Sequence, residues 1–198
     1  MGTIGIFGGA FDPIHIGHLR LVYEILDRLT LDQVRIVPTN IPPHKSKTHA
    51  NGKDRCEIIR SVIKPPLVLD DREIIRGGTS YTIDTIFSVK SEYPESEISL
   101  IIGEDAYLGI ETWHKYETIL EEVRLVVVSR PTRNHAINDL WEKHVHKYGN
   151  RSKAVFFDIP YMPVSSTEIR NKMLEGKSIK YWVPESGEKI IKDRKIYG

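Results

Sequence analysis

Apolar runs of strand length alternate along this chain with segments of helical period. Residues 99–102 and 125–128 form nearly continuous apolar runs, which are typical of strands buried on both faces of a sheet. Residues 16–29 place leucine, isoleucine and valine at steps of three and four, the pattern of an amphipathic helix. This alternation predicts βαβ units, and hence a Rossmann-like α/β fold with three α/β/α layers around a mostly parallel sheet.

The remaining elements follow the same pattern. We expect strands at residues 4–7, 34–37 and 154–157, and short extended segments at 67–69 and 72–76. We expect further helices near residues 52–63, 81–93, 166–174 and 185–192. Residues 39–51 have no periodicity, and a loop of this length is more often functional than idle. Without an internal repeat or linker, residues 1–198 should form one domain, with the C-terminal helices from about residue 165 packed on it.

Charge and composition exclude several classes of protein. Lys and Arg number 28 against 27 for Asp and Glu, so no overall charge attracts a nucleic-acid backbone. The apolar runs are far shorter than the ~20 residues of a membrane span, and the N-terminus does not resemble a signal peptide. Cys56 is the only cysteine, which excludes an internal disulfide and a cysteine-built zinc site. We therefore expect a cytoplasmic protein without nucleic-acid or membrane partners, and the sequence leaves a homo-oligomer open.

The string GGAFDPIHIGH follows the first strand. Gly8 and Gly9 lack the Cβ atoms that keep backbone N–H groups away from an anion, and the next helix points its positive end to the same place. His15 and His18 share one face of the first helical turn, which Gly17 keeps open. Two imidazoles and a helix N-terminus predict a polyphosphate site. The G-x-G-x-x-G fingerprint and the P-loop pattern are absent, which disfavours a dehydrogenase and a P-loop NTPase.

This string resembles the GGxFDPxHxGH signature of the adenylyltransferases in the nucleotidyltransferase superfamily, above all the bacterial nicotinate-mononucleotide adenylyltransferases. The resemblance implies a nucleotidyltransferase-type fold and an enzyme of NAD biosynthesis that transfers AMP from ATP to nicotinate mononucleotide, giving nicotinate adenine dinucleotide and pyrophosphate. It also implies that His18 contacts the α-phosphate of ATP and His15 the neighbouring phosphates. The other ATP-binding residues that it implies in this string are Gly8, Gly9, Phe11 and Gly17.

The string SSTEIR, which begins at Ser165, is a second phosphate-binding candidate. Ser165 and the glutamate three residues later form a capping box, and a capped helix N-terminus still has N–H groups for phosphate. The string resembles the family's SSTxIR motif, which binds the ATP triphosphate. This implies that Ser165, Ser166 and Thr167 bind ATP. It also implies that Arg170 acts with the two histidines in catalysis, and we expect Arg170 to have no partner inside the protein.

The string SYTIDT, which begins at Ser80, resembles the family's SYTxDT segment, whose backbone amides and hydroxyl groups hold the nicotinate carboxylate. The acceptor-binding residues that this implies are Ser80, Tyr81, Thr82 and Thr85. Trp113 lies where the family has a tryptophan that stacks on the pyridine ring, and stacking a flat ring on an indole gains apolar contact. The pattern alone leaves a half-buried core aromatic as the alternative for Trp113.

Shorter matches extend the resemblance over essentially the whole chain. The string GED resembles the family's G-x-D beside the adenosine, which implies ATP contacts from Gly103 and Asp105, although a glutamate stands where the family has a smaller residue. Lys45 in PHK and Arg130 in SRP resemble loop cations near the phosphates, and we assign both to acceptor binding. The tail YWVPES resembles the family's YxVPxS.

The implied reaction is an in-line attack of the acceptor's phosphate oxygen on the α-phosphorus of ATP. This phosphate is already ionised near neutral pH, so positioning and charge stabilisation suffice without a general base. Mg²⁺ should arrive on ATP with phosphate and water ligands, and we assign no protein ligand to it. Three alternatives stay open: an adenylyltransferase for another phosphate such as pantetheine phosphate, a cytidylyltransferase, and a non-catalytic nucleotide-sensing module.

Overall fold

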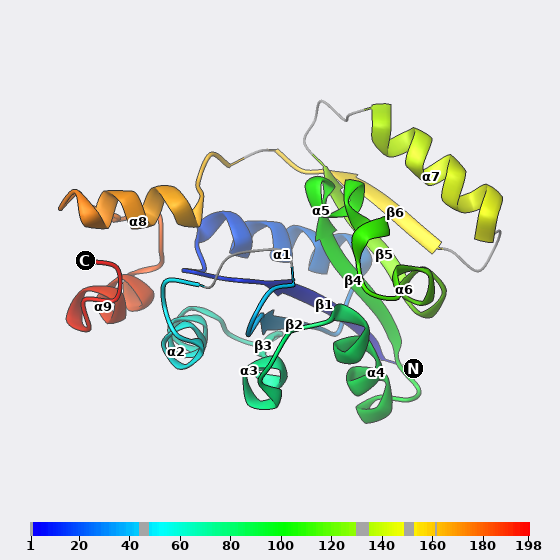
Figure 1. Ribbon diagram of the computed structural model, residues 1–198. Coiled ribbons are helices and arrows are strands. Elements are labelled where there is room, and N and C mark those ends of the chain that lie inside the picture. Colours follow the sequence, from blue (N-terminus) through cyan, green and yellow to red (C-terminus); the bar gives the residue numbers. More distant parts are fainter. Residues whose placement is uncertain (1, 44–47, 130–134, 149–152, 161) are drawn as a thin grey trace.

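A parallel sheet forms the centre of the fold (Figure 1). The computed structural model describes residues 2–43, 48–129, 135–148, 153–160 and 162–198. Within them the sheet has six strands, all parallel, in the order β3-β2-β1-β4-β5-β6. The strands are β1 (Thr3–Gly9), β2 (Gln33–Pro38), β3 (Leu67–Leu69), β4 (Glu97–Gly103), β5 (Arg124–Ser129) and β6 (Lys153–Asp158). The helices are α1 (Ile16–Leu29), α2 (Gly52–Val62), α3 (Arg72–Arg76), α4 (Thr82–Glu92), α5 (Glu104–Leu108), η1 (Ile110–Thr112), α6 (Tyr116–Glu122), α7 (His135–Tyr148), α8 (Ser166–Leu174) and α9 (Glu185–Asp193).

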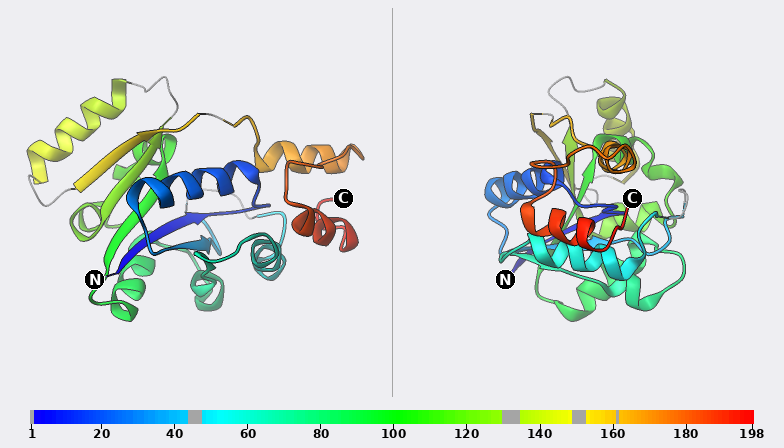
Figure 2. Two further views of the ribbon diagram at one scale, coloured as in Figure 1. Left: turned by 180° about the vertical axis from the view of Figure 1, so that it is seen from behind. Right: turned by 90° about the vertical axis from the view of Figure 1, so that its left-hand side faces the viewer.

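Helices cover both faces of the sheet because successive strand residues point in opposite directions. On β5, Leu125 and Val127 pack into an apolar cluster with α4 and α6. Val126 and Val128 pack into a second cluster, with α1, α2, α8 and α9. The expected three-layer α/β/α arrangement is therefore confirmed. Figure 2 shows α8 and α9 at the end of the molecule opposite the start of β1, with α9 against α2.

The sheet changes its direction of growth between β1 and β4. From β1 the chain adds β2 and β3 on one side, and from β4 it adds β5 and β6 on the other. The two central strands pair from Thr3 opposite Glu97 to Phe7 opposite Ile101, so their carboxyl ends lie side by side. In open parallel sheets, ligands bind at such a switch point.

Most of the expected elements are confirmed, but residues 72–76 form α3 instead of an extended segment. Adjacent isoleucines favour an extended conformation locally. The helix lets Glu73 turn into the interior while Ile75 stays exposed. It also lets the Arg72 Nε–H donate to the Asp70 carboxylate at 2.7 Å. These tertiary contacts override the local preference.

The sequence pattern did not predict α5, η1, α6 and α7, which follow β4 and β5. The first three are only three to seven residues long, too short to display a helical period. In the part of the chain that the structure describes, no helix is long and apolar enough to cross a membrane.

Candidate active site

A large cavity of about 740 Å³ opens at the carboxyl ends of β1 and β4. Its lining includes Gly8, Gly9, His18, Glu73, Ser80, Tyr81, Thr82, Thr85, Gly103, Asp105, Trp113 and His114. A small cavity of about 210 Å³ has a lining that includes His15, Gly17, Arg20, Ser129, Ile159 and Val164. His18 and Val128 line both cavities, so His18 lies between them.

The two motif histidines lie against each other at the start of α1, on the one face that their spacing predicts. Their ring centroids are 3.7 Å apart and their planes differ by 24°. The backbone N–H of His15 donates to Nδ1 of His18 over 3.3 Å, so the neutral His18 ring carries its proton on Nε2 and offers it as a donor. Burial lowers the pKa of His15 to about 4. Burial and the neighbouring His15 lower the pKa of His18 well below its ordinary value.

The glycines of the motif make room for different groups. A Cβ on Gly8 would meet nothing within 4 Å, which leaves the backbone open toward the cavity. A Cβ on Gly9 would lie 3.1 Å from the ring of Phe11, and one on Gly17 would lie 3.1 Å from the ring of His15. Phe11 itself is buried and lines neither cavity, and its ring meets the His18 ring edge-on at 5.2 Å. In this structure Phe11 packs against the His18 ring and faces neither cavity.

Asp12, to which we assigned no role from the sequence, is the centre of a buried hydrogen-bond network. Its carboxylate accepts the backbone N–H groups of His49 at 2.7 Å and Ala50 at 3.0 Å. It also accepts the hydroxyl of Tyr197 at 2.9 Å. Burial, followed by the charge of Asp12, raises the pKa of the Tyr197 phenol, which therefore stays a donor. Asp12 thus ties the motif to the end of the 39–51 loop and to the C-terminus.

Arg170 does have partners inside the protein, so the expectation that it has none is wrong. Its Nη1–H donates to the backbone oxygen of Asp12 at 2.7 Å, and its Nη2–H donates to Oγ1 of Thr167 at 3.1 Å. Nη1 also lies 3.9 Å from the Asp12 carboxylate. A carbonyl of the motif loop that is held away from water needs a donor, and Arg170 supplies it. The guanidinium keeps further N–H groups for a phosphate.

The N-terminus of α8 carries the expected cap. Oγ of Ser165 accepts the backbone N–H of Glu168 at 3.2 Å, which confirms Ser165 as the N-cap. The Glu168 carboxylate accepts the Ser165 hydroxyl at 2.8 Å instead of the Ser165 backbone N–H, so the reciprocal bond of the expected capping box differs. Ser166 donates its hydroxyl proton to the backbone oxygen of Pro13 at 2.8 Å. Because the hydroxyl protons of Ser165 and Ser166 are used inside the protein, α8 offers a phosphate the backbone N–H groups that precede Glu168. The Thr167 hydroxyl accepts from Arg170 and keeps its own proton as a further donor.

Arg55 is a second buried cation behind the motif that the sequence reasoning missed. Its side chain is fully buried on α2, and Nη1–H donates to the backbone oxygen of Ala10 at 2.6 Å. Its Nε has no hydrogen-bond partner within the part of the chain that the structure describes. Burial lowers the pKa of Arg55. A guanidinium nevertheless stays charged, so it places a positive charge next to the Gly8–Gly9 turn.

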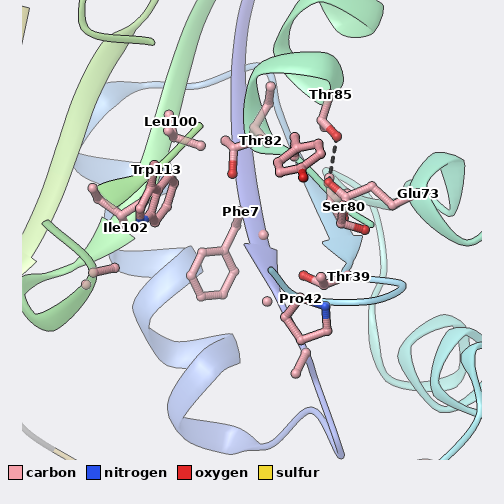
Figure 3. A pocket seen from close by; sticks show the side chains of 18 of the residues that line it. Phe7, Thr39, Pro42, Glu73, Ser80, Thr82, Thr85, Leu100, Ile102 and Trp113 are labelled. Carbon is pink, nitrogen blue, oxygen red and sulfur yellow. Dashed lines mark hydrogen bonds between the residues drawn. The ribbon is translucent and has the colours of Figure 1, made fainter. Parts of the chain in front are cut away.

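Ser80 and Thr85 line the large cavity, and Glu73 accepts a hydrogen bond from the Thr85 hydroxyl (Figure 3). Oγ1 of Thr85 donates to Oε1 of Glu73 at 2.6 Å and accepts from Arg76 at 3.1 Å. Oγ of Ser80 accepts the Asn40 N–H at 2.9 Å, and its hydroxyl lies beside Glu73, where it opposes the rise in the pKa of that carboxyl group. The Thr85 proton is therefore not available to a ligand carboxylate, which corrects that part of the expectation. No pattern in the sequence indicates this contact, because Glu73 lies outside the SYTIDT string.

The other acceptor candidates face the same cavity. Tyr81 and Thr82 line it at the start of α4, where no side chain among the described residues caps the helix. Trp113 lies beside Leu100 and Ile102, across the cavity from Glu73 (Figure 3). Trp113 also packs against the apolar cluster behind it, so it borders both the core and the open space.

Gly103 and Asp105, the G-x-D candidates, line the large cavity directly after β4. Asp105 is exposed, so its carboxylate is free to accept ribose hydroxyl groups. Lys45 and Arg130 lie outside the described residues, and their assignment to acceptor binding stays a prediction.

The sequence profile of the Cytidylyltransferase-like family matches residues 6–172. The chain belongs to this family. Relatives of this cytidylyltransferase-like chain include a protein of Exiguobacterium sibiricum, 36% identical over 98% of both chains. Another, from Pseudomonas syringae pv. tomato, is 35% identical over 92% of this chain and 88% of its own. Both are named "Probable nicotinate-nucleotide adenylyltransferase".

Solved structures agree on the fold of this cytidylyltransferase-like chain. The Plasmodium falciparum nicotinic acid mononucleotide adenylyltransferase complexed with NaAD has a TM-score of 0.76 at 21% identity, over 100% of this chain and 98% of its own. The same enzyme complexed with APC has a TM-score of 0.75 at 20% identity, with the same coverage. The nucleotidyltransferase-type fold is therefore confirmed.

Proposed function

We propose that this chain is a nicotinate-nucleotide adenylyltransferase, which transfers AMP from ATP to nicotinate mononucleotide and releases pyrophosphate. The observation that carries the proposal is the place of His18 between the two cavities at the switch point. The large cavity has an aromatic wall at Trp113 that suits a pyridine ring. His18, at the boundary of the two cavities, is a donor for a phosphoryl group that is transferred from one nucleotide to the other. The names of the bacterial relatives support the same reaction and acceptor.

The reaction needs no general base from the protein. An ionised oxygen of the acceptor's phosphate attacks the α-phosphorus of ATP, and a new P–O bond forms. The bond from that phosphorus to the bridging oxygen breaks, and its electron pair leaves with pyrophosphate. Because the nucleophile is already an anion, the protein contributes alignment and stabilisation of the charge that spreads over the phosphoryl oxygens.

We assign that stabilisation to donors from three parts of the chain. The Nε2–H of His18, fixed by the bond that Nδ1 accepts, serves the α-phosphate. His15 lies against it for the neighbouring phosphates. Arg170 and the first turn of α8 serve the outer phosphates, since guanidinium and helix N–H groups match phosphate oxygens. The backbone at Gly8 and Gly9, at the carboxyl end of β1, completes the cradle.

We assign Mg²⁺ to the triphosphate of ATP. Among the described residues no group of three or more His, Cys, Asp or Glu side chains gathers into a metal site. An ion that arrives on ATP has phosphate and water ligands. Such an ion reduces the negative charge of the phosphates when it is bound. ATP and nicotinate mononucleotide are the proposed partners. The cytoplasmic location and the homo-oligomer stay predictions.

The proposal is tested by pyrophosphate release with ATP or CTP as donor and a panel of acceptor phosphates. We expect ATP with nicotinate mononucleotide to be the best pair. Preference for pantetheine phosphate, or for CTP, would assign the chain to another reaction, and no turnover with any pair would favour a nucleotide sensor. His18→Ala should lower kcat by roughly 10²–10³, as loss of one transition-state donor does. If only the acceptor KM rises, His18 is a binding residue.

A further inference from the structure

Glu73 is a buried carboxylate that the proposed reaction does not use. It is 6% exposed on α3, and it lines the large cavity. Burying a carboxylate is costly unless hydrogen bonds compensate. Burial accordingly raises the pKa of Glu73, while its hydrogen bonds oppose that rise. Because burial of the Glu73 carboxylate costs free energy, its place beside a ligand cavity suggests a role other than packing.

The contacts of Glu73 form a clamp around the start of α4. Thr85, in the first turn of the helix, donates to Glu73 at 2.6 Å. Ser80, two residues before the helix, has its hydroxyl beside the same carboxylate and accepts the backbone N–H of Asn40 at 2.9 Å. The clamp thereby joins α3, the segment after β2 and the first turn of α4, all at one wall of the cavity (Figure 3).

The clamp has a consequence for the backbone. Serine and threonine hydroxyl groups near a helix start compete for its free N–H groups, and a side-chain cap closes the N-terminus to other anions. Here Glu73 accepts the hydroxyl of Thr85 and lies beside that of Ser80, and no side chain of the described residues caps α4. The N–H groups at Tyr81 and Thr82, which line the cavity, precede the first helical hydrogen bonds and remain for a ligand.

We propose that Glu73 is a positioning residue that keeps the first turn of α4 open and oriented toward the acid group of the acceptor. This inference rests on the proposed function and deepens it. Glu73 does not bind the acid group, because two carboxylates repel each other. It acts through Ser80 and Thr85, and it sets how strongly the site prefers an acid over the corresponding amide.

The test compares Glu73→Gln with Glu92→Gln. The glutamine has the same shape, but its NH₂ cannot accept a hydroxyl proton, so one hydroxyl group is released to compete for the N–H groups of α4. Glu92 lies at the other end of α4, pairs with Arg72 at 2.7 Å, and lines neither cavity. For each protein, kcat and KM are measured with nicotinate mononucleotide, its amide and ATP, and folding is checked by thermal melting.

We expect the wild type to prefer the acid by at least ~10-fold in kcat/KM. Glu73→Gln should lower the acid-to-amide ratio by at least ~5-fold through the acid KM, with the ATP KM within about 2-fold. Glu92→Gln should keep the wild-type ratio. Thr85→Val, which removes one arm of the clamp without changing its shape, should lower the ratio by a smaller factor and serves if Glu73→Gln does not fold.

Two results distinguish a failure of this inference from a failure of the proposed function. If the wild type prefers the acid but Glu73→Gln and Thr85→Val lose both acceptors equally, Glu73 only supports the fold and this inference is overturned. If the wild type turns over neither pyridine nucleotide, the proposed function fails and the inference falls with it.

Discussion

Replacing Arg170 with alanine tests whether one side chain both holds the motif loop and binds ATP. The variant loses a charge-assisted hydrogen bond of 2.7 Å to the backbone oxygen of Asp12, in a side chain that is only 15% exposed. Hydrogen bonds to charged groups contribute about 1.5–3 kcal/mol, and a buried carbonyl without a donor costs a similar amount. The bond to Thr167 is exposed and adds little. We therefore expect a loss of about 2 kcal/mol in the free energy of unfolding.

For a chain of this size, that loss lowers the melting temperature by roughly 4–8 °C. Urea denaturation measures the stability, and steady-state kinetics well below the melting transition measure the turnover of folded protein. Arg170→Ala should raise the ATP KM and lower kcat. Arg170→Lys should recover only part of both losses, because an ammonium cannot form two parallel hydrogen bonds. Thr167→Val, which removes the exposed partner, should leave the melting temperature nearly unchanged.

Two outcomes would refute this reasoning. A variant that melts like the wild type would show that the Asp12 contact does not stabilise the fold. A variant that loses stability but keeps the wild-type kcat and ATP KM would make Arg170 a structural residue. The triphosphate site would then be limited to the histidines, the backbone and the remaining loop cations.

The other predictions concern Trp113 and the histidines. Trp113→Ala should weaken the pyridine nucleotide by about 1–2 kcal/mol at constant ATP KM, and equal loss of both substrates with early melting would assign Trp113 to the core. The folded pKa of His15 is about 4, below the ordinary 6.5, so the unfolded chain binds this proton first. Stability should be fully present above pH 6.5 and fall by about 3 kcal/mol for His15 alone as the pH drops to 4. An unchanged pH slope in urea titrations of His15→Asn would contradict this.

The sequence alone determined those helices and strands in which the buried residues recur with a regular period. The run at 125–128 predicts a doubly buried strand because each side chain alternates between two apolar faces, and the structure places those side chains in two clusters. The spacing of His15 and His18 likewise predicts that they share one face of the first helical turn, and in the structure their rings stack there. Local spacing is enough where the contact partners are close in the chain.

Only the tertiary structure decided the contacts between distant segments. Arg170 meets Asp12 across 158 residues, and Tyr197 meets it across 185, so no local pattern reveals that the motif carbonyl and carboxylate engage them. Glu73 accepts a hydrogen bond from the Thr85 hydroxyl only because α3 folds against α4. The sequence therefore determined which chemical groups the site contains. The fold decided which of their protons and lone pairs remain for a ligand, because burial obliges polar groups to find partners wherever the chain brings them.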